Sequence, residues 1–202
     1  MANGVGHSVG AYVVSRVTGY SRPLLELVDM KCESGDSLSL LRPGHRVFSL
    51  ISCAEGLRTD VDLWVASADE AGRAYLVPLS YYWDGSTLTM ATPRTSRTAV
   101  NIIRAGWARV ALGPTRDVVI IEGPVEAIPI GTDTQLEDAH AQATGFDPRT
   151  LAEQYVYLQI TPHEIQAWRE ANELEDRQLM RRGEWLDPVG ARPPSGPDKK
   201  IR

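Results

Sequence analysis

The sequence predicts a small antiparallel β-barrel, a mainly β fold of the α+β class. Short apolar segments separated by tight turns follow one another through the middle of the chain, and few helical segments lie between them. The chain has 202 residues. Because domains average roughly 150 residues, this length suits one domain with appendages and excludes a nucleotide-binding domain joined to a separate substrate domain.

Six segments have the apolar content of β-strands and are bounded by turn residues. They are residues 61–68, 73–83, 87–91, 107–112, 117–128 and 155–161. The pair Asp84-Gly85 lies between the second and third segments. It predicts a hairpin with a type I′ turn, because these two residues tolerate positive φ angles. Strands in this order along the chain predict a meander.

Four further segments have helical patterns. They cover residues 44–54, 96–104, 134–144 and 171–182. In the second of them, Ser96 is predicted to cap the helix start and Gly106 to end the helix. The fourth is polar throughout, and Gly183 is predicted to stop it.

Composition divides the chain into three parts. Residues 1–37 mix glycine, serine and charge with short apolar pieces, which predicts an N-terminal extension. Residues 38–186 contain the segments of the barrel domain. Residues 187–202 contain four prolines and end in basic residues. They are predicted to form a disordered tail, because such a segment buries too little apolar surface to offset its ordering entropy.

The chain has no signal for a membrane or for export. No apolar run approaches the ~20 residues that cross a bilayer, and the first residues lack the basic segment of a secretory leader. Two cysteines, Cys32 and Cys53, are too few for a disulfide framework. We therefore expect a cytoplasmic protein.

Charge and histidine spacing exclude two further classes of protein. The net charge is −5, from 21 basic and 26 acidic side chains, which argues against a broad basic surface for nucleic acid. The four histidines are His7, His45, His140 and His163. They lie far apart in the sequence and lack the neighbouring ligands of a zinc motif, so no metal site is predicted.

One stretch has the composition of a phosphate site. It begins where the third strand ends and a helix starts, a place where free backbone N–H groups and the helix dipole favour an anion. Its hydroxyl, guanidinium and amide side chains are Thr92, Arg94, Thr95, Ser96, Arg97 and Asn101. Hydroxyls and guanidinium groups are strong donors to phosphate oxygens. A capped helix with two solvated arginines would have the same sequence, so both interpretations stay open here.

Five short motifs occur in one order along residues 42–186. They are residues 73–78, Ala91-Thr92 followed by Ser96-Arg97-Thr98, Arg116-Asp117-Val118, the triple Pro162, Ile165 and Trp168, and residues 173–177. In this order they resemble the pyridoxamine 5′-phosphate oxidase-like superfamily, and in particular its actinobacterial branch. The resemblance implies a split β-barrel of about six antiparallel strands that binds FMN or the deazaflavin F420 and has a few short helices.

The resemblance also implies site residues. The FMN phosphate would be held by Arg73, Thr92, Ser96 and Arg97. The isoalloxazine ring would lie along Val77, Pro78 and Leu79. A second copy of the chain would contribute Trp168 and Arg177, because the family binds its cofactor at a homodimer interface. From the residues alone, Trp168 also fits a core aromatic, and Arg177 fits a surface partner of Glu173 on a helix.

The chain departs from the oxidase pattern at four positions. Pro78 and Thr98 stand where the oxidases have lysines, which weakens the expected grip on phosphate. Glu173 and Glu175 stand where the oxidases place a substrate-binding arginine and histidine. Carboxylates there would repel the phosphate of pyridoxine 5′-phosphate, so no pyridoxamine-phosphate oxidase activity is predicted.

The first functional hypothesis is a homodimeric FMN-dependent oxidoreductase acting on a small molecule. The alternatives are an F420-dependent reductase on the same fold, a non-catalytic protein that binds flavin or haem, and a barrel without a cofactor. Because the cofactor would carry the chemistry, no acid–base residue is assigned, and Tyr81, Tyr82 and His163 stay open as candidates.

Overall fold

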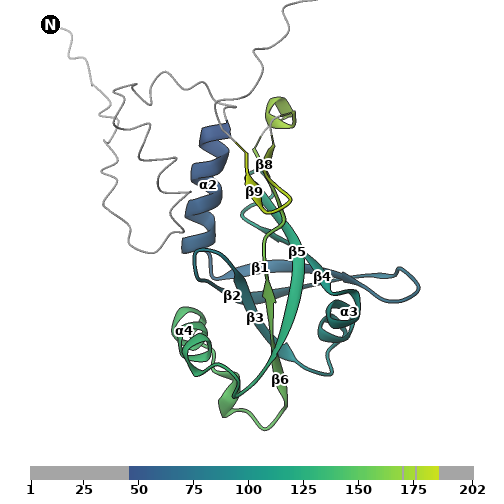
Figure 1. Ribbon diagram of the computed structural model, residues 1–202. Coiled ribbons are helices and arrows are strands. Elements are labelled where there is room, and N and C mark those ends of the chain that lie inside the picture. The colour runs from purple at the N-terminus through teal and green to yellow at the C-terminus, as the bar shows by residue number, and fades with distance from the viewer. Residues whose placement is uncertain (1–45, 170, 176, 187–202) are drawn as a thin grey trace, which may run out of the picture.

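The computed structural model describes residues 46–169, 171–175 and 177–186 (Figure 1). The expected extension at residues 1–37 and the expected tail at residues 187–202 lie outside the described residues. Six strands form the barrel: β1 (Asp62–Ala68), β2 (Ala74–Trp83), β3 (Leu88–Pro93), β4 (Trp107–Leu112), β5 (Val118–Pro129) and β6 (Tyr155–Ile160). Each strand is antiparallel to its neighbours in the closed order β1-β2-β3-β6-β5-β4. The predicted split β-barrel of about six antiparallel strands is confirmed.

The core fills the inside of this barrel. Leu63 and Val65 alternate with outward-facing residues on β1, as do Ala108 and Val110 on β4. This alternation is the two-residue period of a strand with one buried face.

Helix α2 (Arg46–Thr59) packs on the same core through Cys53 and Leu57. The Tyr81 hydroxyl donates a hydrogen bond to the Gly56 carbonyl at 3.0 Å and fastens α2 to β2. Burial raises the pKa of the Cys53 thiol to about 12. The thiol therefore stays protonated and serves packing.

Two more helices flank the barrel (Figure 1). Helix α3 (Arg97–Ala105) begins after Ser96, whose hydroxyl accepts a hydrogen bond from the Ala99 N–H, and it ends at Gly106 with φ 64°. Helix α4 (Thr134–Thr144) packs against the outer face of β2 and against Tyr157 of β6. Both predicted helices are confirmed, and α4 explains why β6 is buried on both faces.

Residues 171–182 were predicted to form a polar helix, and this is wrong. The chain makes one 3₁₀ turn at η3 (Ala171–Glu173), then strand β8 (Gln178–Arg181) and the short strand β9 (Glu184–Trp185). Strand β8 pairs with β7 (Glu164–Trp168), which extends the sheet beyond β5. The helix-forming composition is overridden because adjacent residues Leu179 and Met180 are both buried in this pairing.

The hairpin turns also differ from expectation. Asp84 does not adopt the positive φ of a type I′ turn. The loop spans residues 84–87, and the Asp84 carboxylate accepts hydrogen bonds from the backbone N–H groups of Ser86 and Thr87. Two successive positive φ angles occur instead at Arg182 (56°) and Gly183 (79°), between β8 and β9. Gly183 therefore belongs to a hairpin turn and does not stop a helix.

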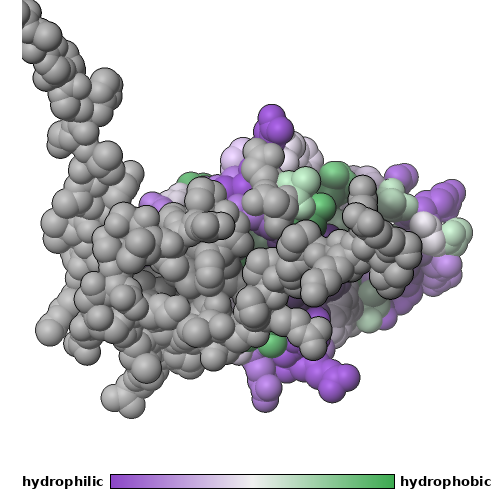
Figure 2. Space-filling view, turned by 90° about the horizontal axis from the view of Figure 1, so that it is seen from above, coloured by the Kyte–Doolittle hydropathy of each residue, from purple (hydrophilic) through white to green (hydrophobic). Residues whose placement is uncertain are grey.

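The visible surface mixes charged and apolar side chains. Seen from above, hydrophilic and hydrophobic residues are interspersed where grey atoms leave the face open (Figure 2). Among the described residues, no helix combines the length and apolar character needed to span a bilayer.

Gly123 marks the point where β5 changes one of its partners. Before it, β5 pairs with β7, and after it with β6. The connection between β6 and β7 crosses here, and a Cβ atom at Gly123 would lie 1.9 Å from the Thr161 carbonyl oxygen and 3.1 Å from the His163 nitrogen. Only glycine allows the two backbones to approach this closely.

Replacing Gly123 with alanine should therefore separate β5 from this connection. We expect Gly123→Ala to lower the free energy of unfolding by about 3 kcal/mol, since backbone atoms cannot rotate aside as a side chain can. Chemical denaturation measures the change. Gly72→Ala is the control, because a Cβ at Gly72 meets nothing within 4 Å and only its positive φ opposes it. Equal losses in the two variants would contradict this account.

Candidate functional site

The candidate site lies where β2 and β3 separate. Only the last three residues of β2, residues 81–83, pair with β3, whereas its first seven pair with β1. Between the separated segments lies a pocket of about 330 Å³, a volume at the lower end of the range for small-molecule sites. Its apolar wall is formed by Pro78 and Leu79 of β2 and by Ala91 and Pro93 of β3.

A polar corner adjoins this pocket at the end of β3. Thr92 is buried, and its hydroxyl lies 3.0 Å from the Ser96 hydroxyl, which caps α3. The start of a helix leaves its first N–H groups without intrahelical acceptors. The guanidinium carbon of Arg97 lies 5.9 Å from the centroid of the Tyr75 ring on β2. The corner therefore combines hydroxyls, helix N–H groups and one cation.

Among the described residues, no carboxylate neutralises the charge of this corner. Arginines elsewhere pair with carboxylates, as Arg104 does with Glu70 and Arg109 with Glu122. Within the described ranges, Arg94 and Arg97 have no carboxylate within ion-pair distance. An unpaired cation beside a helix N-terminus is suited to bind an anion.

The other residues predicted for this corner lie at its margin. Arg94 and Thr95 are exposed in the connection from β3 to α3. Asn101 is buried one turn into α3, where its amide donates to the Ser67 hydroxyl at 3.3 Å and fastens the helix to β1. Arg73 ends the β1–β2 turn, and its Nε lies 2.7 Å from Asp69 Oδ2. Hydrogen bonds from the Arg73 backbone and side chain lower the pKa of Asp69, so this pair is charged at neutral pH.

Trp168 and Arg177 lie together but away from this corner. The Arg177 guanidinium is 5.7 Å from the Trp168 ring centroid. Trp168 pairs with Val118 at the first residue of β5, whereas Thr92 pairs with Val156, which faces Pro129 at the last residue of β5. One copy of the chain therefore holds the two groups at opposite ends of a strand of 12 residues. The alternative for Arg177, a pair with Glu173 on one α-helix, is wrong because the 3₁₀ turn η3 ends at Glu173 and strand β8 begins at Gln178.

The acid–base candidates have different surroundings. Tyr81 is buried, and burial, with Asp60 and Cys53, raises its pKa far above the usual value. His163 is partly exposed, and its ring lies 5.3 Å from the Trp107 ring. Tyr82 is half-buried on β2. None of the three lines the pocket between β2 and β3.

Residues 53–169 match the family described as Pyridoxamine 5′-phosphate oxidase. The chain belongs to this family. No curated protein matches it.

Solved structures that are similar to this chain are distant from it in sequence. A conserved hypothetical protein from Mycobacterium tuberculosis is 15% identical with a TM-score of 0.50, over 60% of this chain and 85% of that one. A haem-binding protein from Mycobacterium smegmatis is 12% identical with a TM-score of 0.51, over 65% of this chain and 57% of that one. General Stress Protein 26 from Bacillus anthracis is 16% identical with a TM-score of 0.48, over 58% and 92%. At these identities the likeness extends to the fold alone.

The structure adds His140 to the residues of this pyridoxamine 5′-phosphate oxidase family member that line the pocket. In the sequence, His140 was tested only as a metal ligand. Its place in the pocket wall follows from the packing of α4 on β6, where its ring contacts Tyr157. Among the described residues, no group of three or more His, Cys, Asp and Glu side chains is arranged to hold a metal ion. Burial lowers the pKa of His140 to about 4, with the Phe146 backbone and Asp147 opposing the shift.

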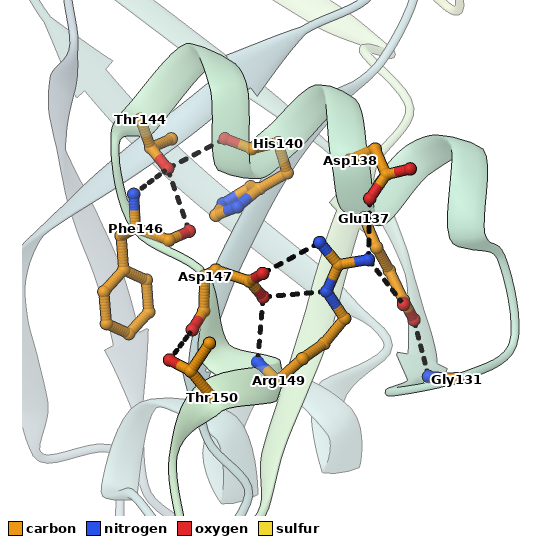
Figure 3. Close-up of polar contacts among 9 residues, drawn as sticks. All are labelled: Gly131, Glu137, Asp138, His140, Thr144, Phe146, Asp147, Arg149 and Thr150. Carbon is orange, nitrogen blue, oxygen red and sulfur yellow. Dashed lines mark hydrogen bonds and ion pairs between the residues drawn. The ribbon is translucent and has the colours of Figure 1, made fainter.

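A charged network holds His140 in place (Figure 3). Arg149 binds both oxygens of Asp147 at 2.8 Å and reaches Asp138 at 2.7 Å. Glu137, one turn before His140, is buried and accepts from the Gly131 N–H. These contacts fasten α4 to the segments on both sides of it and so fix the wall of the pocket.

The depressed pKa of His140 predicts a pH dependence of stability. The unfolded chain takes up a proton near pH 6.5 and the folded protein only near pH 4, so stability should fall as the pH drops through this window. We expect His140→Phe to flatten the decline, as measured by melting temperature between pH 7 and pH 4. The lowered pKa of Asp147 acts below this window, since an unperturbed aspartate titrates near ~3.9.

His163→Phe is the matched control, because the His163 side chain is 40% exposed. It should keep the wild-type decline. An unchanged pH profile in His140→Phe would contradict the assignment of this decline to the buried ring.

Proposed function

We propose that the protein is a cytoplasmic, flavin-dependent oxidoreductase that binds FMN between two copies of the chain and transfers hydride to or from a small molecule. The observation that carries this proposal is the apolar pocket between β2 and β3 beside the cationic start of α3. Thr92 joins the two parts. Its side chain belongs to the corner, and its neighbours Ala91 and Pro93 line the pocket.

The residues present fit the two ends of such a cofactor. Thr92, Ser96, Arg97 and the first N–H groups of α3 would hold the phosphate, with Arg94 and Thr95 beside them. Val77, Pro78 and Leu79 would lie along the ring. Arg73 would join the phosphate ligands only by leaving Asp69. When bound, the flavin supplies the hydride chemistry, and the protein binds and orients it and excludes water.

The position of Trp168 and Arg177 supports a site shared by two copies. They cannot reach the corner of their own chain, because the length of β5 lies between them. An exposed apolar face next to the pocket offers a contact surface. Trp64 is 50% and Leu76 is 58% exposed, and Trp64 lies opposite Pro78 in the β1–β2 pairing. Apolar surface of this kind is typical of homodimer interfaces.

Arg97→Ala tests the phosphate site. We expect FMN to bind about 10- to 100-fold more weakly, because charge-assisted hydrogen bonds to phosphate are lost. Quenching of flavin fluorescence in a titration measures the affinity. Arg58→Ala is the control, since Arg58 does not line the pocket and is exposed on α2, which packs mainly against β7 and β8. Unchanged FMN affinity in Arg97→Ala would refute the role of this corner.

Leu76→Asp tests the dimer. A charge in the apolar face should weaken self-association by about 100-fold or more, and native mass spectrometry should record monomers without bound FMN. Leu151→Asp is the control, because Leu151 is 44% exposed and lies outside the β1–β2 face. A Leu76→Asp variant that stays dimeric would argue against this face as the interface.

One observation favours F420 as the second candidate cofactor. Pro78 and Thr98 replace the lysines of the FMN oxidases, and Thr98 is buried on α3. Native mass spectrometry of freshly purified protein distinguishes the two, since bound FMN gives a defined added mass. A colourless protein that quenches F420 fluorescence would favour the deazaflavin.

A non-catalytic role is the third candidate, and the neighbour from Mycobacterium smegmatis is named as a haem-binding protein. This role predicts bound flavin or haem and no hydride transfer with any reduced donor.

Pyridoxine 5′-phosphate should not be a substrate. Glu173 is buried and accepts a hydrogen bond from the Arg169 N–H at 2.8 Å, so its carboxylate is fixed in the loop after β7. Glu175 adds a second carboxylate two residues later. Assays with FMN and oxygen should record no oxidation of pyridoxine or pyridoxamine phosphate above background. Turnover at ordinary rates would contradict this prediction.

A further inference from the structure

The pocket between β2 and β3 carries a negative charge of its own. Of the described residues that line it, only Asp62 is charged at neutral pH, because burial lowers the pKa of His140 to about 4 and leaves its ring neutral. Asp62 is the first residue of β1 and lies opposite Ser80 of β2. The end of the pocket at Asp62 therefore differs in charge from the cationic corner at Arg97.

The Asp62 carboxylate is oriented but has no counter-charge. Its Oδ1 atom accepts a hydrogen bond from the Ser80 hydroxyl at 2.6 Å. In the part of the chain that the structure describes, its Oδ2 atom has no hydrogen-bond partner and no basic side chain pairs with it, whereas Asp69, Glu122 and Asp147 each pair with an arginine. An oriented carboxylate beside apolar walls is suited to accept hydrogen bonds from a cationic N–H group.

Two aromatic rings form another wall of the pocket. Phe146 and Tyr155 line it, and their ring centroids lie 5.6 Å apart at an interplanar angle of 54°. Phe146 is 36% exposed, and its ring lies apart from the ion pairs around Arg149 (Figure 3). The electron-rich face of an aromatic ring attracts a cation that lies over it. Carboxylate and aromatic rings therefore favour the same kind of ligand, and Pro78 and Leu79 add apolar contact.

We propose that this pocket binds an organic cation, namely a protonated amine on an apolar or aromatic body. The ammonium group donates to Asp62, and the body packs against Phe146 and Tyr155. The inference rests on the proposed function, since it names the class of small molecule that lies beside the flavin. A carboxylate or phosphate in the same place would face Asp62 without a compensating cation, so anionic substrates are disfavoured.

Three probes that share a phenyl ring test this charge preference. They are benzylammonium, the neutral benzyl alcohol and the anion benzoate, and calorimetric titration of the full chain, with and without FMN, measures their affinities. We expect benzylammonium to bind about tenfold more tightly than benzyl alcohol, the effect of one charge-assisted hydrogen bond. Benzoate should bind more weakly than either. Added salt should weaken the binding of benzylammonium alone, because salt screens the attraction to an exposed carboxylate.

Asp62→Asn separates the charge from the shape of the pocket, because asparagine keeps an acceptor for the Ser80 hydroxyl. It should lower the affinity for benzylammonium to that for benzyl alcohol and leave the affinity for benzyl alcohol unchanged. Phe146→Leu keeps an apolar side chain and loses the aromatic face, so it should weaken benzylammonium about threefold more than benzyl alcohol. Glu184→Gln is the matched control, because Glu184 is exposed on β9, which pairs with β8 and not with the strands of the pocket.

Each outcome separates this inference from the proposed function. No measurable binding, equal affinities for the three probes, or an unchanged preference in Asp62→Asn overturns the inference and leaves the proposed function standing if FMN binds. An equal loss of all three probes in Asp62→Asn assigns Asp62 a structural role and also overturns it. Loss of benzylammonium binding in the FMN-loaded protein does the same, because a substrate has to lie beside the flavin. Selective binding of benzylammonium by a protein that binds neither FMN nor F420 keeps the cation site and overturns the proposed function.

Discussion

The separation of β2 from β3 is the constraint on which the rest of the site depends. Residues 81–83 of β2 pair with residues 88–90 of β3. Beyond them, β2 pairs only with β1 and β3 only with β6, so each strand has an open edge that faces the other strand. Pro78 sits on such an edge, the position where a strand tolerates a residue without an N–H group. The pocket is the space between these edges, and α4 closes it from outside the barrel.

Because side chains alternate between the two faces of β3, this strand places apolar residues on one side and a hydroxyl group on the other. Ala91 and Pro93 point to the pocket, whereas Thr92 between them points to Ser96 and the start of α3. A register shift of one residue would exchange the two sets of side chains. The apolar lining and the hydroxyl corner therefore lie on opposite faces of one strand, next to its open edge, within a single domain.

Local signals in the sequence predicted most of the fold, and long-range contacts explain the rest. Ser96, Gly106 and the bounds of α4 follow from capping and periodicity, which act within a few residues. Residues 178–181 form a strand because β7 lies beside them. The local sequence pattern does not indicate this pairing. In the candidate site, the donors at residues 92–97 could be found in the sequence because they lie close together along the chain. The place of His140 in the pocket could not be found there, because it depends on the packing of α4 on β6.

The electrostatic contrast between the ends of the site limits what can bind. Arg97 lies over the Tyr75 ring with no carboxylate partner in the described part of the chain, so the corner keeps a positive charge although the whole chain carries −5. At the other end, the desolvated ring of His140 stays neutral at physiological pH. A ligand with anionic groups at both ends would lose hydration in the apolar pocket, where no cation would compensate for the loss. A neutral ligand would leave the Arg97 guanidinium without a counter-charge. A molecule with one anionic terminus and one uncharged planar end would match this contrast, which is the basis on which we propose a flavin nucleotide.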